Sequence, residues 1–311
     1  MNFEPDDEQR QILEAVTSLL GQHAGPARAK ELAPAAGYDH ALDAALSDAG
    51  FDAVMEPSER AGALEAILIV EAIAGAAGVT AFAAGAVVAP AVAGERLPGP
   101  VALGTGIARA PVRYGAHAKS LLWLDGDEAR RCPLAPGDVS PVPSNFGYPL
   151  GRISPGAMAA GTSLGAGSGA LLHRWWRLAL AAEAVGTMEA ALGHTTAYLK
   201  ERRQFGRPIA SFQAVQHRLA ECAIGIEGSR WLVREAAHQW APEEATACAA
   251  AHALSTARQV FREVHQLSGA IGFTRDHDLH AWSMRLHALG AELSGVGGHR
   301  RALAAARWGV G

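Results

Sequence analysis

The residues best suited to chemistry are concentrated between Tyr198 and Ile209. The segment follows a long stretch of helical periodicity and contains three arginines, an aromatic ring and a glycine: Arg202, Arg203, Phe205, Gly206 and Arg207. A guanidinium group holds a phosphate oxygen through charge-assisted hydrogen bonds, an aromatic ring can stack on a heteroaromatic base, and glycine permits a close backbone approach. A plainer explanation also stands, because basic residues at the end of a helix complement its dipole.

A second candidate is the segment from His265 to Phe273. The small residues Ser268, Gly269 and Ala270 would let backbone amides face a ligand after the end of a helix. The same pattern is typical of a glycine that simply terminates a helix. The sequence alone leaves both explanations open.

Two further patterns are weaker. Residues 161–165 match G-x-S-x-G, which in a hydrolase would make Ser163 the nucleophile, but that device needs a strand before the serine and a helix directly after it. Alanine-rich sequence precedes Ser163 and more glycine follows, so we expect a flexible connector over 161–169. His277 and His280 lack a further cluster of ligands, so we expect the polar start of a helix and no metal site.

The elements that must position these residues fall into three regions. We expect a helical domain over residues 1–95, a reduced β-domain with its glycine-rich connector over 96–169, and a helical bundle over 170–311. The fold class predicted is mainly α with a small β middle domain. Periodicity and turn signals place elements in the first two regions, as helices at 41–49, 59–76 and 80–93 and strands at 121–124 and 139–143.

The third region begins with the strongest periodic signal in the chain. Leu178, Val185, Leu192 and Leu199 recur every seven residues, which predicts a helix of about 30 residues that packs in an antiparallel bundle. Residues 206–208 should end it, because proline cannot continue a helix.

Composition excludes several classes of protein. The 311 residues carry a formal net charge of −4 and are 49% hydrophobic, which argues against a disordered chain and against bulk electrostatic binding of nucleic acid. Three widely separated cysteines argue against a disulfide framework and indicate a reducing cytoplasm, and the acidic start of the chain argues against a secretory signal. The uncharged stretch 72–94 is long enough to span a membrane, but its alanines and glycines favour a buried pair of helices.

Taken together, the two candidate segments are recognisable. Residues 202–209, followed by Phe212 to His217, resemble the C-terminal signature of the acyl-CoA dehydrogenase family, and Gln266 to His280 resemble its second signature. The helices before residue 95 are also similar to that family's. The resemblance implies an N-terminal helical domain, a central β-domain and a C-terminal four-helix bundle, with FAD bound at a dimer interface. It further implies oxidation of an acyl-CoA, in which a carboxylate takes the α-proton and the flavin takes the β-hydride.

The resemblance also assigns residues that would bind FAD. They would contact the adenosine diphosphate half of an FAD seated in the neighbouring subunit. Arg202 would meet the pyrophosphate, and Gln204 and Phe205 would border the adenosine. Gln213 would donate a hydrogen bond to the cofactor. Four residues of the second signature would line the pyrophosphate: Gln266, Ser268, Gly269 and Ala270.

The sequence departs from the family at the segments that hold the flavin ring and at the positions of the catalytic base. Residues 102–108 stand where the family has Thr-Glu-Pro and Gly-Ser-Asp segments, and they contain neither Glu-Pro nor Gly-Ser-Asp. Of the two positions at which members carry the catalytic glutamate, one is occupied by Trp176 and the other has only Glu292 nearby. We therefore assign no catalytic residue and expect Glu292 at the surface.

These features resemble the short subunit of heteromeric, α2β2 acyl-CoA dehydrogenases of actinobacteria that shorten steroid side chains. The resemblance implies FAD shared with a longer catalytic partner, an acyl-CoA substrate, and no nucleic acid or membrane. The alternatives are a homomeric dehydrogenase with Glu292 as base, a structural pseudoenzyme subunit, and, more remotely, a serine hydrolase using Ser163. The sequence leaves open the acyl group, the partner, and whether the chain binds FAD alone.

Overall fold

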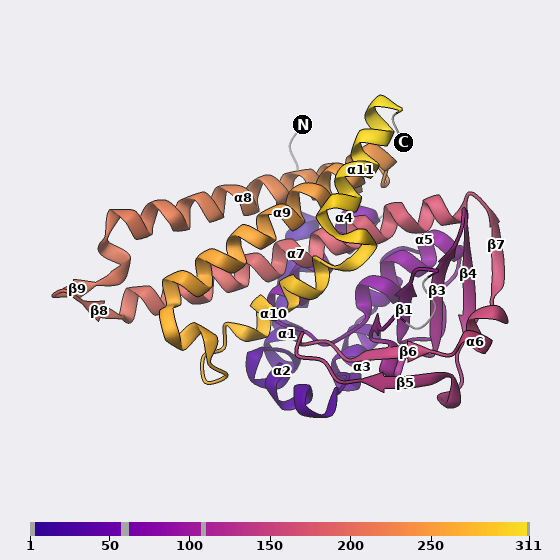
Figure 1. Cartoon of the computed structure of the whole chain (residues 1–311), viewed down its shortest axis with the longest axis horizontal. Helices are drawn as coiled ribbons and strands as arrows, with labels where there is room; N and C mark the ends of the chain where they lie inside the picture. The colour runs from indigo at the N-terminus through magenta and orange to yellow at the C-terminus, as the bar shows by residue number, and fades with distance from the viewer. Residues whose placement is uncertain (1–3, 57–61, 107–109, 310–311) are drawn as a thin grey trace.

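The computed structural model describes residues 4–56, 62–106 and 110–309, and places a long helical bundle beside two small sheets (Figure 1). The chain begins with four helices, α1 (Asp7–His23), α2 (Pro26–Leu32), α3 (His40–Asp48) and α4 (Ala63–Gly75). The Asp6 side chain accepts a hydrogen bond from the Gln9 amide, and the Gln9 side chain accepts one from the Asp6 amide, so α1 begins with a capping box. The helices predicted near 41–49 and 59–76 are confirmed in α3 and α4, although residues 59–61 lie outside the described ranges.

The uncharged stretch 72–94 forms buried helical turns. It contains the end of α4, the π-helix η3 (Ala83–Val88) and α5 (Ala89–Ala93). Most of its side chains are buried, so the expectation of buried helices is confirmed. Among the described residues, no helix is both long and apolar enough to cross a membrane.

The middle region contains two sheets. The first has the strand order β1 (Val101–Gly104), β3 (Ser120–Asp125), β4 (Glu128–Pro133) and β7 (Thr162–Ala166), with β1 parallel to β3 and the other pairs antiparallel. The second is antiparallel, in the order β2 (Val112–Arg113), β6 (Leu150–Ile153) and β5 (Val139–Val142), and the short helix α6 (Pro155–Ala159) follows it. The strands predicted at 121–124 and 139–143 are confirmed as β3 and β5.

The expectation of a flexible connector over 161–169 is wrong. Thr162 and Ser163 pair with Arg131 and Arg130 of β4, so the small residues of this segment complete the first sheet as its edge strand. Gly161 is needed at the entry, because a Cβ there would overlap the Cys132 sulfur. Gly161 and Gly169 are therefore positions where the backbone passes close to its neighbours, whereas Gly165 and Gly167 supply positive φ angles.

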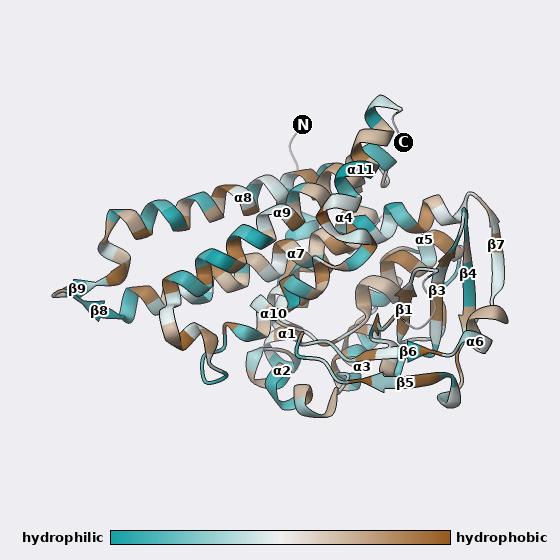
Figure 2. Ribbon diagram, in the orientation of Figure 1, coloured by the Kyte–Doolittle hydropathy of each residue, from teal (hydrophilic) through white to brown (hydrophobic). Residues whose placement is uncertain are grey.

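The helical bundle is formed by α7 (Ser168–Glu201), α8 (Gln213–His238), α9 (Glu243–Ser268), α10 (His280–Leu289) and α11 (Gly295–Trp308). The prediction of one helix of about 30 residues is confirmed by the 34 residues of α7, and Leu178, Val185 and Leu199 are fully buried. α7 ends at Glu201, before the predicted stop at residues 206–208, because Arg202 is already extended and begins a short hairpin of β8 (Arg203–Gln204) and β9 (Arg207–Pro208). Figure 2 shows β8 as hydrophilic and the middle of β3 as hydrophobic, in keeping with an exposed hairpin and a buried strand.

Candidate functional site

The two predicted cofactor-binding segments lie at the same end of the bundle, remote from the sheets (Figure 1). α7 ends there, the β8–β9 hairpin turns the chain and α8 begins at Gln213. The antiparallel α9 returns to this end, where the 3-10 helix η7 (Gly269–Phe273) follows Ser268. The fold thus brings together the ends of helices that are about 60 residues apart in the chain.

The β8–β9 hairpin presents Phe205 at its tip. Phe205 and Gly206 both have left-handed backbone angles, with φ of 52° and 80°, and the Phe205 side chain is 91% exposed. Below the tip, the Ile209 amide donates to the Arg202 carbonyl at 2.8 Å, and the Arg207 guanidinium lies 4.0 Å from the centre of the Phe212 ring. These contacts hold the base of the hairpin, while the Phe205 ring, which lies edge-on to Phe212 with 6.2 Å between centroids, is exposed to a ligand or a second subunit.

Several cations near the hairpin lack counterions. Within the described ranges, the side chains of Lys200, Arg202 and Arg203 make no ion pair, and all three are exposed. Arg230, further along α8, instead contacts the carboxylates of Glu71, Glu189 and Glu227. Uncompensated positive charge beside an exposed ring is the chemistry that recognises a phosphate linked to a heteroaromatic base.

The second segment adds exposed backbone. Gln266, Gly269 and Ala270 are exposed, and Gly269 has a φ of 66° that glycine adopts without strain. Gln213 is exposed at the first position of α8. Ser268 differs, because it is 4% exposed and its hydroxyl has no hydrogen-bond partner among the described residues. Of the eight residues predicted to bind the cofactor, this end of the bundle exposes seven.

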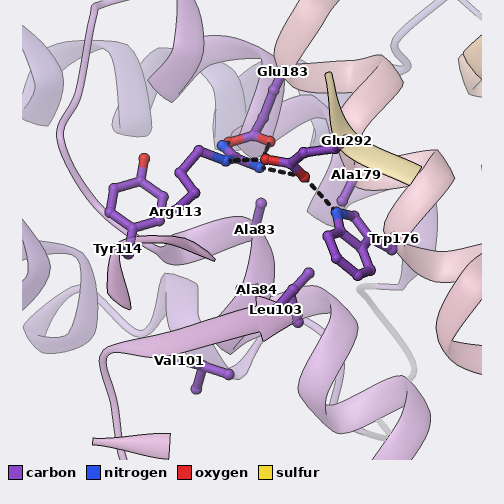
Figure 3. Close-up of a pocket in the computed structure, with 10 residues that line it drawn as sticks. All are labelled: Ala83, Ala84, Val101, Leu103, Arg113, Tyr114, Trp176, Ala179, Glu183 and Glu292. Atoms are coloured by element: carbon purple, nitrogen blue, oxygen red, sulfur yellow. Dashed lines mark hydrogen bonds and ion pairs between the residues drawn. The ribbon is translucent and has the colours of Figure 1, made fainter. Parts of the chain in front are cut away.

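A second polar cluster lies between the second sheet and the bundle (Figure 3). Arg113 of β2 donates to both carboxylate oxygens of Glu183 on α7, through Nη1 at 2.6 Å and Nη2 at 2.8 Å. Its Nε donates to Glu292, in the short helix η8 (Glu292–Ser294), at 2.7 Å. The Trp176 indole Nε1 donates to the other oxygen of Glu292 at 2.6 Å. One arginine therefore joins the sheet, α7 and the chain after α10.

Burial governs the electrostatics of this cluster. Burial lowers the pKa of Arg113, but the adjacent charges of Glu183 and Glu292 outweigh it and hold that pKa well above its usual value. Burial and the Glu183 charge raise the pKa of Tyr148 to about 12, so its hydroxyl stays neutral. The Tyr148 ring also contacts two guanidinium groups, those of Arg113 at 4.9 Å and Arg285 at 5.0 Å.

Little space remains beside this cluster. The cavity lined by Arg113, Trp176, Glu183 and Glu292 has a volume of about 20 Å³, enough for about one water molecule. The expectation that Glu292 lies at the surface is wrong, since its side chain is only 18% exposed. The physical reason is Arg113, which offers a buried carboxylate a partner. Trp176 is 4% exposed and fills part of this space, as its bulk suggested.

Sequence reasoning missed Arg113 and Glu183. A signal for Glu183 was present, because it is a lone acid within the apolar run 178–185 and is 7% exposed in the structure. A charge on a buried helix face requires a partner of opposite sign. Nothing in the sequence around Arg113 marks it as that partner.

The remaining candidates have structural roles. Ser163 lies within β7, and its hydroxyl donates to the Glu128 carboxylate at 2.5 Å. His277 is buried, and its ring centroid lies 4.5 Å from that of His194, so the expectation of a polar helix start is wrong for His277; α10 begins at His280. Among the described residues, no group of three or more potential metal ligands occurs.

Comparisons with known proteins give the family. Residues 172–306 match the acyl-CoA dehydrogenase C-terminal domain. The acyl-CoA dehydrogenase IpdE2 of Mycobacterium tuberculosis is 32% identical over 317 residues, which cover 91% of this chain and 92% of that protein. A chain of the ChsE4–ChsE5 complex of Mycobacterium tuberculosis superposes with a TM-score of 0.81 at 23% identity, covering 98% of each chain. A chain of the Tcur3481–Tcur3483 steroid ACAD superposes with a TM-score of 0.83 at 24% identity, covering 96% of this chain and 97% of that one. The family resemblance and the fold class are confirmed, and the chain belongs to the acyl-CoA dehydrogenase family.

Proposed function

We propose that this chain is the non-catalytic subunit of a heteromeric, FAD-dependent acyl-CoA dehydrogenase. It would complete the FAD site of a longer partner that supplies the catalytic base. One contrast carries the proposal. The bundle end exposes the Phe205 ring and cations that have no ion-pair partner among the described residues, whereas the cavity at Trp176 and Glu292 has a volume of about 20 Å³. The bundle end is thus suited to hold part of a cofactor, and the cavity at Trp176 is too small to hold a substrate.

The residues present fit one half of FAD and not the other. The exposed guanidinium groups of Arg202 and Arg203, the Phe205 ring and the exposed turn at Gly269 suit a pyrophosphate and an adenosine. The cavity at Trp176 has no room for an isoalloxazine ring. When bound, FAD supplies the oxidant that accepts hydride from the acyl-CoA.

The chain's own contribution would be binding and orientation. Arg202 would neutralise pyrophosphate charge, and Phe205, held at the hairpin tip, would border the adenosine. Gln204 and Gln213 would donate hydrogen bonds, and the turn at Gln266, Ser268, Gly269 and Ala270 would line the pyrophosphate. The partner's residues would then do the chemistry on a cofactor oriented from both sides.

The substrate and the assembly rest on the similar proteins. One structural relative is a two-protein complex and another is a two-protein steroid ACAD, so we propose a heterotetramer that acts on a steroid side-chain CoA thioester in the cytoplasm. We also propose that the chain has three domains, with boundaries near residues 95 and 169.

A self-sufficient enzyme with Glu292 as base is the alternative. Both Glu292 oxygens already accept hydrogen bonds, from the Arg113 Nε at 2.7 Å and the Trp176 Nε1 at 2.6 Å. A base must reach the substrate proton, and this carboxylate faces a cavity too small to admit an acyl-CoA. The geometry therefore favours the heteromeric function.

Co-expression tests the proposal. The chain would be purified alone and together with a longer dehydrogenase encoded beside it, and flavin absorbance and acyl-CoA oxidation would be measured on both. We expect a colourless, inactive chain and a yellow, active complex. A yellow and active chain without a partner would overturn the heteromeric function.

Substitution separates a working FAD site from an idle one. In the complex, Arg202→Ala should lower the flavin content, and Arg258→Ala is the matched control. Arg258 is an exposed arginine of α9 that makes no side-chain ion pair with any described residue. Unchanged flavin content in Arg202→Ala would favour a structural pseudoenzyme subunit.

A further inference from the structure

A cavity of about 350 Å³ lies apart from both sites described above. It is open to solvent on one side and is lined mainly by α3, by η3 and by the segments that lead into β1 and β3. Its volume falls within the range of about 300–1,000 Å³ that is usual for small-molecule sites. The substrate-side cavity at Trp176 is much smaller, and the two share only Val101 among the residues that line them.

The cavity exists because the helical wall carries short side chains. Ala81, Gly85 and Ala86 line it, and Gly85 and Ala86 belong to the π-helix η3. A Cβ at Gly85 would make an ordinary contact with Val101 Cγ2 at 3.7 Å, so glycine leaves space that a larger residue would fill. Leu46 and Phe82 add apolar surface. π-helical turns frequently occur at functional sites.

The two carboxylates on the wall already have partners. The Tyr38 hydroxyl donates to Asp43 at 2.7 Å, and the Thr80 hydroxyl donates to the other oxygen of Asp43. The Ser47 hydroxyl donates to Asp52 at 2.7 Å, and Arg96 forms an ion pair with Asp52. Hydroxyl groups therefore satisfy both oxygens of Asp43, and Arg96 neutralises Asp52.

Lys119 is the exception on this wall. Its backbone is held, because its amide donates to the Pro100 carbonyl at 2.8 Å and its carbonyl accepts from the Leu134 amide at 2.9 Å. Its side chain is exposed and makes no ion pair with any residue that the structure describes. The cavity thus combines an apolar patch on its helical wall with a lysine that has no ion-pair partner among the described residues.

We propose that this cavity binds a small amphipathic carboxylate, with its apolar body against η3 and its carboxylate beside Lys119. The apolar wall removes hydrocarbon from water, and Lys119 selects the anionic head over a neutral or cationic one. None of these residues belongs to the proposed FAD site, so the two proposals stand independently.

Isothermal titration calorimetry of the full chain tests the site with three probes of matched length: sodium octanoate, octan-1-ol and octylamine. We expect saturable binding of octanoate with one site per chain, weaker binding of octan-1-ol and the weakest binding of octylamine. The proposal would be overturned if octanoate showed no saturable binding, or if octylamine bound as tightly as octanoate.

Two variants locate the binding. Gly85→Leu should abolish it, while Gly193→Leu, on a helical glycine of α7 with open space around it, should leave it unchanged. Lys119→Ala should weaken octanoate binding about two- to fivefold and remove its advantage over octan-1-ol, because an exposed ion pair is worth that much. Arg258→Ala is the control for loss of a surface cation. Circular dichroism checks the folding of each variant, and undiminished binding by folded Gly85→Leu or Lys119→Ala would contradict the assignment.

Discussion

Arg113 and Glu183 form a two-pronged ion pair, with N–O distances of 2.6 and 2.8 Å, that joins the second sheet to the longest helix of the bundle. The pair is buried, with side-chain exposures of 12% and 9%. Removing Arg113 would leave the buried Glu183 carboxylate without a counterion among the described residues. We therefore expect Arg113→Ala to lower the free energy of unfolding by about 3–5 kcal/mol, measured by urea denaturation. Arg10→Ala, which breaks an exposed pair with Asp7, should change it by less than about 1 kcal/mol. Equal effects of the two substitutions would mean that the Arg113–Glu183 pair is not buried in solution.

Trp176 should stabilise the protein through its indole N–H as well as its bulk. Trp176→Phe keeps most of the volume but removes the donor to Glu292, so we expect a loss of about 1.5 kcal/mol in the free energy of unfolding. Trp240→Phe is the control, because the Trp240 side chain is 60% exposed and its replacement should cost about 0.5 kcal/mol or less. A loss no larger than that of the control would show that the Trp176–Glu292 hydrogen bond contributes nothing.

The sequence predicts the helices of this fold better than it predicts the polar cluster around Arg113. The apolar period of α7 predicts a long helix, because periodicity is a local property of the chain, but it does not predict that residues 175–188 are all buried. The partner of Glu183 is 70 residues away at Arg113, and only the fold brings them together. β7 escaped prediction for a similar reason, since Thr162 and Ser163 form a strand only by pairing with β4. The residues of the FAD segments were identified by a motif, and their role in binding FAD remains a prediction.

Phe205 should matter to the assembly and not to the free chain. Its side chain is 91% exposed, so Phe205→Ala should change the free energy of unfolding by less than about 0.5 kcal/mol. In the proposed complex it should lower the retained flavin, measured by absorbance after gel filtration. Phe146→Ala, at a side chain 40% exposed in the middle region, serves as the control. Full flavin retention by Phe205→Ala would remove this residue from the proposed site.

Buried histidines should make stability depend on pH. Burial, with a contribution from Arg177, lowers the pKa of His299 on α11 from 6.5 to about 4. Between these two pH values, His299 is protonated in the unfolded chain and neutral in the folded chain. The stabilisation is complete above about pH 6.5 and is lost as the pH falls towards 4. We expect His299→Gln to flatten the dependence of the unfolding free energy on pH in that window. Burial also lowers the pKa of His194 and His265, so some slope should remain in the variant. An unaltered slope would show that His299 titrates normally in the folded chain.

Two glycines of α7 should respond in opposite ways to the same substitution. A Cβ at Gly186 would overlap the carbonyl oxygen of Glu71 on α4, whereas a Cβ at Gly193 would meet nothing within 4 Å. Gly186→Ala should force α4 and α7 apart and destabilise the protein by about 1–3 kcal/mol or more. Gly193→Ala should stabilise it by about 0.5–1 kcal/mol, because alanine is the better helix former. Thermal unfolding followed by circular dichroism measures both, and a stable Gly186→Ala variant would contradict the close packing of α4 against α7.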